Sequence, residues 1–326
     1  MNQRVFGKTG RKISEIGLGT WQLGTRWGDP FNHEEALKIL ETADENGITF
    51  IDTADVYNDG KSEETIGEYI AAHPNRFYVT TKCGRRLNPH TAEMYTPAAI
   101  SGFIEGSLKR MKLERLDMIL LHCPPTSVYR RDDIFGALER QKQAGRIADY
   151  GVSIEKVEEG LQAMEYDISA VEVIFNMFRL KPLDQLFPAA KKKNVGIIAR
   201  VPLASGLLTG RYTKDTVFGP QDHRTYNRDG AAFDKGETFS GIPYDLGLEA
   251  VEALKDVFGP ADLASYAIRW ILMHPEVSVV IPGASKASQV AANVKAAELP
   301  ELTREQMEAV TAVYDRFLRE SIHPQW

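Results

Sequence analysis

The stretch ITFIDTADVYNDGKSEETIGEYI, residues 48–70, contains a strand, a loop and a helix in the order that repeats along this chain. Its start, ITFID, is an apolar run of the length of a buried strand, and KSEETIGEYI has apolar residues at helical spacing. Asp52 closes the strand, and Tyr57 lies in the loop that follows it. Repeated units of this kind build a parallel sheet whose faces are covered by helices.

The same alternation extends over most of the sequence. We expect eight strands, at residues 15–19, 48–52, 77–81, 117–121, 147–153, 170–175, 196–201 and 277–281. We expect helices at residues 33–47, 61–73, 96–111, 132–145, 155–165, 184–194 and 261–275, and a further helix that starts near residue 285. The segment RVFGKTGRKIS, residues 4–14, predicts a β-hairpin at the N-terminus.

The stretch GLGTWQLG, residues 17–24, separates the two folds that fit this alternation. An open doubly wound sheet normally binds its dinucleotide on a G-x-G-x-x-G turn, but Gln22 stands where the third glycine is required. We therefore predict an α/β fold, a (β/α)8 TIM barrel in which residues 1–326 form one domain. The active site of such a barrel lies at the C-terminal ends of its strands.

Four polar residues stand at or just after expected strand ends: Asp52, Tyr57, Lys82 and His122. A barrel gathers such positions at one end. A buried Asp–Lys pair beside a tyrosine can lower the pKa of the phenol and prepare it to donate a proton, while a histidine positions the acceptor oxygen. The set predicts a carbonyl-reduction site. In a competing interpretation, Lys82 is the Schiff-base nucleophile of an aldolase.

Three separated motifs resemble the signatures of the aldo-keto reductase family: residues 50–70, residues 108–125 (LKRMKLERLDMILLHCPP) and residues 280–293 (VIPGASKASQVAAN). Residues 17–24 and 197–210 (IIARVPLASGLLTG) extend the resemblance, which is greatest to bacterial stress-related NADPH-dependent members. It implies hydride transfer from NADPH to an aldehyde or ketone, with detoxification of reactive carbonyls as the role. Tyr57 would then be the general acid, supported by Asp52 and Lys82, and His122 would orient the substrate carbonyl.

The resemblance also implies where the cofactor binds. Lys286 with Ser285 and Gln289 would hold the adenosine 2′-phosphate at a helix N-terminus, with Asn293 near the adenine. The other implied cofactor contacts are Gly19, Thr20, Asp52, Ser153, Asn176, Arg200, Leu203, Ser205, Gly206, Leu208 and Gly283. Three positions depart from the family pattern: Glu172 replaces a frequent amide residue, Arg200 a frequent aromatic residue and Ala292 a frequent glutamate.

Residues 205–247 lack a clear period and follow the seventh strand, so the predicted barrel carries a long loop there. We interpret this loop as a clasp over the cofactor or a wall of the substrate pocket; a partly disordered insertion is the alternative. Trp21 and Trp27 are candidates for the lining of an apolar substrate pocket, although tryptophans in loops also pack structurally.

Composition restricts the class of protein. A formal net charge of −6 and a pI near 5.7 argue against a nucleic-acid partner, and the basic run at residues 191–196 is typical of a helix end. No run approaches the ~18 apolar residues of a membrane helix, and the N-terminus has no signal-peptide pattern, so we expect a cytoplasmic protein.

The chain has only two cysteines, Cys83 and Cys123, which excludes a disulfide framework and a Cys-rich zinc site. Strand alternation predicts that both are buried small apolar residues, and a redox-sensitive thiol is the alternative. We expect no metal, because no second histidine or cysteine stands at ligand spacing from His122. A binding module that senses the NADPH/NADP⁺ ratio remains a rival to an enzyme. The sequence does not indicate an oligomeric state.

Overall fold

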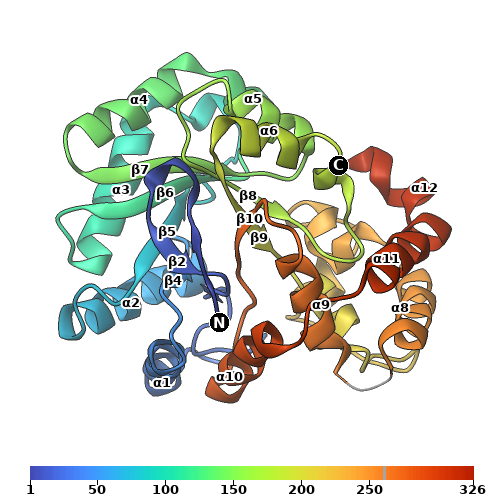
Figure 1. The fold of residues 1–326 in the computed structure, drawn as a ribbon. Coiled ribbons are helices and arrows are strands. Elements are labelled where there is room, and N and C mark those ends of the chain that lie inside the picture. The colour runs from blue at the N-terminus through green and yellow to red at the C-terminus, as the bar shows by residue number, and fades with distance from the viewer. Residues whose placement is uncertain (260–261) are drawn as a thin grey trace.

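A computed structural model describes residues 1–259 and 262–326 and shows a closed ring of parallel strands surrounded by helices (Figure 1). The strands of the ring are β3 (Leu18–Gly19), β4 (Phe50–Asp52), β5 (Tyr78–Cys83), β6 (Leu116–His122), β7 (Ile147–Ser153), β8 (Ala170–Ile174), β9 (Gly196–Arg200) and β10 (Val277–Val280). Each pairs in parallel with the next, from β3 through to β10. This is the predicted (β/α)8 barrel.

The ring closes between its first and last strands. Ile16 bridges Val280 and Gly19 bridges Gly283, both in parallel register. The amide of Gly17 donates to Val280 O at 2.8 Å, and the amide of Val280 donates to the carbonyl of Glu15 at 3.0 Å. These bonds remove the two free edges that an open sheet would expose.

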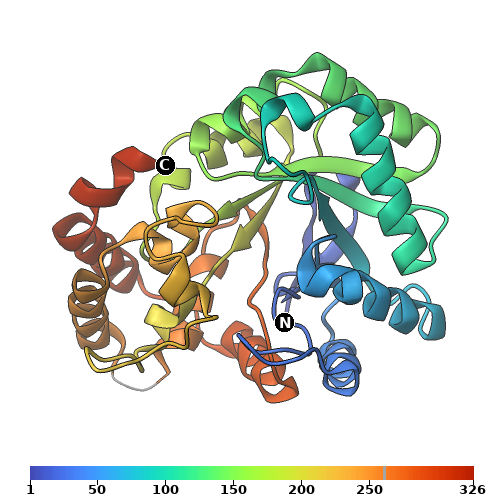
Figure 2. The same cartoon turned by 180° about the vertical axis from the view of Figure 1, so that it is seen from behind.

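The helices form the outer layer of the barrel (Figures 1 and 2). They are α1 (His33–Glu45), α2 (Lys61–Ala72), α3 (Pro97–Met111), α4 (Asp132–Gln143), α5 (Val157–Ala163), α6 (Leu186–Lys193), α7 (His223–Tyr226), α8 (Tyr244–Phe258), α9 (Leu263–Leu272), α10 (Ala287–Lys295), α11 (Arg304–Phe317) and α12 (Arg319–Ile322). Local signals explain their starts: Asn32 caps α1 through Glu35 N, and Thr96 caps α3 through Ala99 N with Pro97 at the first turn.

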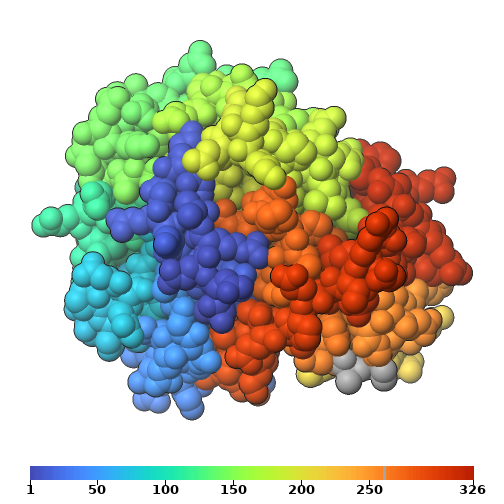
Figure 3. Space-filling model, viewed as in Figure 1, coloured from blue at the N-terminus to red at the C-terminus, as the bar shows by residue number. Residues whose placement is uncertain are grey.

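Short 3₁₀ helices occupy many of the connections: Gly7–Thr9, Tyr57–Gly60, Ala92–Met94, Thr126–Arg130, Lys181–Leu183, Ala204–Thr209, Lys235–Glu237, Phe239–Gly241, Ala296–Glu298 and His323–Gln325. The predicted β-hairpin is also present, as β1 (Gln3–Val5) and antiparallel β2 (Lys12–Ser14). In the space-filling view the N-terminal segment lies across the face of the barrel (Figure 3). Phe6 and Ile13 of this hairpin pack with Phe50 and Tyr78 inside the ring, and so close that end with apolar side chains.

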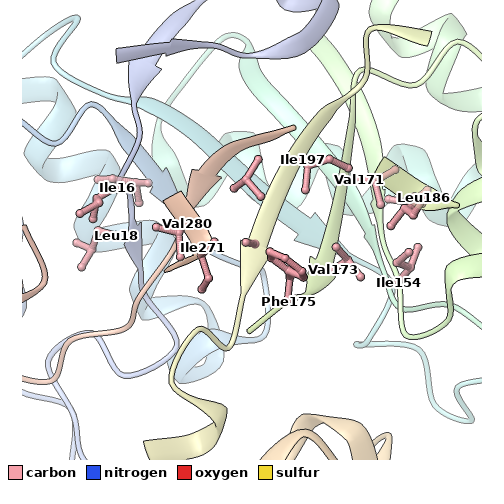
Figure 4. Packing of buried hydrophobic residues seen from close by; sticks show 14 of the residues in the cluster. Ile16, Leu18, Ile154, Val171, Val173, Phe175, Leu186, Ile197, Ile271 and Val280 are labelled. Atoms are coloured by element: carbon pink, nitrogen blue, oxygen red, sulfur yellow. The ribbon is translucent and has the colours of Figure 1, made fainter. Parts of the chain in front are cut away.

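The core has two layers. A small cluster fills the ring, and a larger one lies between the strands and the helices; Figure 4 shows Leu18, Val171 and Ile197 among the buried side chains of the larger cluster. Burial of each such side chain contributes about 1.5–3 kcal/mol. The side chains of each strand point alternately into the ring and toward the helices, and both sides are apolar. This explains why the strand segments are nearly continuous apolar runs in the sequence.

The structure differs from the sequence prediction mainly in the C-terminal half. Two long helices were not predicted, α8 and α11, and α8 begins at Tyr244, inside the segment predicted as loop. The predicted helix at 261–275 is α9, which begins at Leu263; residue 261 lies outside the described residues. The rest of the long loop contains short helices and buried polar residues such as Asn227 and Ser240, so it packs onto the barrel.

Gly67 allows α2 and α3 to approach closely, because a Cβ at this position would overlap the backbone of Met111. We expect Gly67→Ala to lower the free energy of unfolding by about 1–3 kcal/mol, since the helices would have to separate. Gly102 on α3 is the matched control: it is exposed, and a Cβ there meets no described atom within 4 Å. Gly102→Ala should raise the free energy of unfolding by about 0.5–1 kcal/mol. Urea denaturation measures both, and equal effects would contradict the packing argument.

Candidate active site

The four residues singled out in the sequence converge at the C-terminal end of the barrel. Asp52 is the last residue of β4, Lys82 lies in β5, His122 ends β6 and Tyr57 begins the 3₁₀ turn after β4. Lys82 Nζ lies 2.5 Å from Asp52 Oδ1 and 3.5 Å from the Tyr57 hydroxyl. The Tyr57 ring stands edge-on to the imidazole of His122, with 5.9 Å between ring centroids. The ammonium, the phenol and the imidazole therefore surround one small region.

Lys82 is fully buried and contacts a second carboxylate, because Glu172 Oε2 lies 3.4 Å from its Nζ. Burial alone would lower the pKa of Lys82, but Asp52 and Glu172 together raise it above the ordinary lysine value. Burial, followed by the charge of Glu172, raises the pKa of Asp52 well above its usual range. One ammonium thus lies between two buried acidic groups.

Tyr57 and His122 are both held in their neutral forms by burial. Desolvation raises the pKa of Tyr57, and the nearby ammonium of Lys82 acts in the opposite direction. Desolvation lowers the pKa of His122 well below its usual value, and the charges of Arg85 and Lys82 add to this effect. A neutral imidazole beside a protonated phenol offers two hydrogen-bond donors to a carbonyl oxygen.

A groove of about 420 Å³ runs from these residues across the closure of the barrel. It is lined by many of the predicted cofactor-contact residues, namely Gly19, Thr20, Asp52, Arg200, Leu203, Ser205, Gly206, Gly283, Ser285 and Gln289. Lys286 lies next to it, in a surface groove between the starts of α1 and α10. Asn293 is also near, since its Nδ2 donates to Gly283 O at 3.4 Å.

Three of the other predicted contacts lie inside the protein, away from the groove. Asn176 is fully buried, and its amide group is engaged by Val201 O, Ser240 Oγ and Phe178 N. Leu208 belongs to the apolar core, and buried Ser153 at the end of β7 is paired in register with His122 of β6. These side chains support the walls of the groove from inside the protein.

The backbone of the groove suits an extended anionic ligand such as a dinucleotide. A Cβ at Gly19 would lie 2.8 Å from Ile281 O, so only glycine fits at this position in the lining of the groove. Ser205 and Gly206 have φ of 55° and 96°, so the chain turns sharply at this edge of the groove, and the amide of Gly206 donates to Leu203 O at 2.9 Å. At the start of α10, Gln289 Oε1 accepts from the amides of Ser285 and Lys286, and so orders this N-terminus. These features fit NADPH.

An outer cavity of about 660 Å³ opens on the other side of Tyr57 and His122. One wall is aromatic: Trp21 stands at 4.7 Å from Trp27 and 5.9 Å from Phe233 between ring centroids. Both tryptophans thus line this cavity, and their place in a substrate pocket stays a prediction. Phe233 comes from the long loop, which therefore contributes a wall of the cavity, and His223 of the same loop packs on Trp27 and lines the groove.

The opposite wall is ionic and was not identified from the sequence. Arg85 Nη2 lies 2.5 Å from Glu237 Oε1 and 3.6 Å from Glu155 Oε1. Arg200 reaches the same two carboxylates, at 3.1 Å from Glu155 and 3.6 Å from Glu237. Arg85 lies three residues after Lys82, and Glu155 lies two residues after the end of β7. Their positions just after strands could have indicated that they belong to the site. The sequence around Glu237 carries no such indication.

The prediction for Cys83 agrees with the structure, but that for Cys123 was wrong. Cys83 is buried in the core. Cys123 has φ of 46°, which breaks the strand alternation after His122 and turns its side chain toward the outer cavity. Its sulfur, Glu155 and Glu237 place possible metal-ligand atoms within 4.8 Å of one another. The two guanidinium groups already neutralise these carboxylates, so the cluster does not fit a cation.

Comparisons with known proteins agree with this geometry. A family model described as "Aldo/keto reductase family" matches residues 15–315. An uncharacterized oxidoreductase, YqkF, of Bacillus subtilis (strain 168) is 29% identical over 316 residues, 95% of each chain. The structure of the glycerol dehydrogenase AKR11B4 from Gluconobacter oxydans superposes with a TM-score of 0.79 at 27% identity, covering 100% of this chain and 98% of that one. The structure of aldo-keto reductase AKR11C1 from Bacillus halodurans (holo form) superposes with a TM-score of 0.77 at 26% sequence identity, covering 96% of each chain.

No helix in the described part of the chain combines the length and apolar character needed to span a bilayer.

Asp55 lies under the Tyr57 loop and is fully buried. Neither of its carboxylate oxygens has a hydrogen-bond partner among the residues that the structure describes. Burial, and next the buried carboxylate of Glu63, raise the pKa of Asp55 to about 7. In an unfolded chain an aspartate titrates near ~4. The folded protein therefore retains a proton between these two values that the unfolded chain has released, and its stability falls as the pH rises through this window.

We expect Asp55→Asn to remove this pH dependence. The free energy of unfolding should rise by about 2–4 kcal/mol near pH ~8 and change little near pH ~3, since the carboxyl group is largely protonated in both states at the lower pH. Urea denaturation at a series of pH values measures it, with the exposed Asp229→Asn as the matched control. A variant whose stability shows the same pH dependence as the parent would rule out Asp55 as the group responsible.

Proposed function

Because the chain belongs to the aldo/keto reductase family, we propose that it is an NADPH-dependent enzyme that reduces small aldehydes or ketones to alcohols. One observation carries the proposal: Tyr57 and His122 line both the groove and the outer cavity, so they stand between a dinucleotide site and a substrate site. A carbonyl group bound at this boundary would have the cofactor on one side and two neutral donors on the other.

We assign the proton transfer to Tyr57. Bound NADPH would supply a hydride to the carbonyl carbon. The Tyr57 hydroxyl would give its proton to the carbonyl oxygen as negative charge develops there, and Lys82 at 3.5 Å would stabilise the phenolate that remains. Neutral His122 would orient the oxygen by donating a hydrogen bond, since its lowered pKa keeps it uncharged.

The environment of Lys82 argues against the aldolase alternative. A Schiff-base nucleophile needs a free amine, whereas the two carboxylates around Lys82 favour the ammonium. Borohydride trapping of a substrate on Lys82 would support the aldolase and contradict our assignment. A cofactor-sensing module without turnover would bind NADPH but fail to consume it with any carbonyl compound.

For the cofactor, we propose that Ser285, Lys286 and Gln289 hold the 2′-phosphate, and that Gly19, Ser205 and Gly206 receive the nicotinamide half and the pyrophosphate. The helix N-terminus of α10 adds a favourable partial charge. Arg200 is directed at Glu155 and Glu237, so we expect it to contact the cofactor only at its edge.

We propose that the substrates are small carbonyl compounds. By its resemblance to stress-related reductases, we further propose that the protein detoxifies reactive carbonyls in the cytoplasm. The aromatic wall would pack against the carbon chain. The ionic wall offers hydrogen-bond donors from two arginines and acceptors from two carboxyl groups, which suits hydroxylated substrates. One similar protein is named a glycerol dehydrogenase, which agrees with a polar product. A panel of aldehydes, ketones and polyols, assayed by the absorbance of the reduced nicotinamide, tests the proposal.

Tyr57→Phe should remove the acid and leave the ring in place. We expect kcat for carbonyl reduction to fall by about 10²–10⁴-fold, because general acid catalysis contributes that much. The NADPH dissociation constant, measured by quenching of protein fluorescence, should stay within a factor of about two, since the cofactor contacts are intact. A variant that retains the parent's kcat would contradict the acid role of Tyr57.

Lys286→Met should reduce the preference for NADPH. Loss of a charged hydrogen bond to a phosphate costs about 1.5–3 kcal/mol, so the dissociation constant for NADPH should rise about 10–100-fold while that for NADH stays unchanged. Lys295→Met, an exposed lysine at the other end of α10, is the control and should alter neither. Equal weakening of both cofactors in Lys286→Met would show that the residue does not recognise the 2′-phosphate.

A further inference from the structure

Lys82 serves two carboxylates from opposite sides of the barrel. Asp52 comes from β4 and lies 2.5 Å from Nζ, and Glu172 comes from β8 and lies 3.4 Å from it. The side chains of Lys82, Glu172 and Asp52 are 0%, 2% and 3% exposed, so solvent scarcely screens these charges. Two further polar groups surround the same ammonium: the carbonyl of Thr53 at 3.1 Å and the Tyr57 hydroxyl at 3.5 Å.

The carboxylate of Glu172 has no hydrogen-bonded cation of its own. Its Oε2 has no hydrogen-bond partner in the described residues, and its other oxygen lies 3.7 Å from Arg200 Nε. Arg200 meets Glu155 more closely, at 3.1 Å, and also donates to Ile154 O at 3.1 Å. The negative charge of Glu172 therefore acts chiefly on Lys82.

Other ionisable groups face this cluster from every neighbouring element. They are Asp52 from β4, Tyr57 from the following turn, His122 and Cys123 from the end of β6, Arg85 after β5, Glu155 after β7, Arg200 from β9 and Glu237 from the long loop. The two arginines are paired with Glu155 and Glu237. Glu172 is thus the second acidic group on Lys82, beside Asp52.

The ammonium of Lys82 is the charge that favours ionisation of Tyr57. After burial, which raises the pKa of Tyr57, Lys82 is the main influence that lowers it, whereas Asp52 and Glu172 raise it again. A second carboxylate on the same ammonium thus weakens the cation's effect on the phenol.

Building on the proposed function, we propose that Glu172 is a positioning residue that acts through Lys82. By sharing the ammonium with Asp52, Glu172 keeps the Tyr57 phenol protonated over the neutral and alkaline range and so favours proton donation over proton removal. The site is then biased toward carbonyl reduction, and alcohol oxidation requires a higher pH.

Glu172→Gln tests the inference, because it removes the charge and preserves the shape of the side chain. Tyrosine labelled at Cζ allows the ionisation of Tyr57 to be followed by NMR in the cofactor-free protein, with the resonance assigned by its loss in Tyr57→Phe. We expect the titration of Tyr57 in Glu172→Gln to move by about one pH unit or more toward lower pH. If the parent does not titrate while folded, a variant that does titrate sets a lower limit to this shift.

Two further variants separate charge from general structural effects. Glu172→Asp should keep the parent's titration, because it restores a carboxylate next to Lys82. Glu165→Gln removes a carboxylate that is 76% exposed, beside Lys193, and should also leave Tyr57 unchanged. Dissociation constants for NADPH, measured by fluorescence, show whether Glu172→Gln alters cofactor binding as well.

The pH profile of kcat provides the second measurement. In Glu172→Gln, the alkaline limb for carbonyl reduction should move to lower pH, in the same direction as the NMR titration, and alcohol oxidation should become active at lower pH. A Glu172→Gln protein whose Tyr57 titration and pH profile both match the parent's overturns the inference, even if its kcat is reduced. If no protein turns over any carbonyl compound, the proposed function fails, and the NMR titration still decides the role of Glu172.

Discussion

The barrel depends on hydrogen bonds between its first and last strands. The backbone of residues 15–19 meets that of residues 280–283, and Gly19 makes the approach possible, because a Cβ there would lie 2.8 Å from Ile281 O. A Cβ at Gly17 would lie 2.9 Å from the ring of Phe50 on the neighbouring strand β4, so this glycine leaves room for the packing inside the ring. Gly19 is therefore required for closure of the ring. Without closure, β4, β5 and β6 would still be neighbours, but β8 and Glu172 would not face Lys82 across the interior.

The sequence predicted those parts of the fold that are marked by local patterns of residues. All eight strands lie within a few residues of their predicted positions, because each is an apolar run that ends at a polar residue or a turn. Asp52, Lys82 and His122 could be identified for the same reason: the position of a residue on a strand fixes which end of the barrel it occupies. The α8 helix was missed because YDLGLEAVEALKDVF follows an irregular segment without a clear boundary.

The ionic wall could not be predicted, since its members meet only through the tertiary structure. Arg85 and Glu237 are more than a hundred and fifty residues apart in the sequence and 2.5 Å apart in space. The error for Cys123 has a different origin. Alternation of side chains holds only while the backbone remains extended, and the left-handed φ of 46° at Cys123 ends the extended backbone at His122, the last residue of β6. A single dihedral angle thus decides whether the thiol faces the core or the cavity.

The two ends of the barrel divide stability and chemistry between them. At the hairpin end, Phe6 and Ile13 fill the ring with apolar side chains, which contribute to stability by burial. At the opposite end the interior holds Asp52, Lys82 and Glu172, and buried ion pairs of this kind contribute little net stability because desolvation offsets their attraction. The cluster places one ammonium between two buried acidic groups, and burial followed by the charge of Glu172 raises the pKa of Asp52 well above its usual range. A fold selected for stability alone would have placed apolar residues here, so we attribute these groups to the proton transfer that we propose at Tyr57.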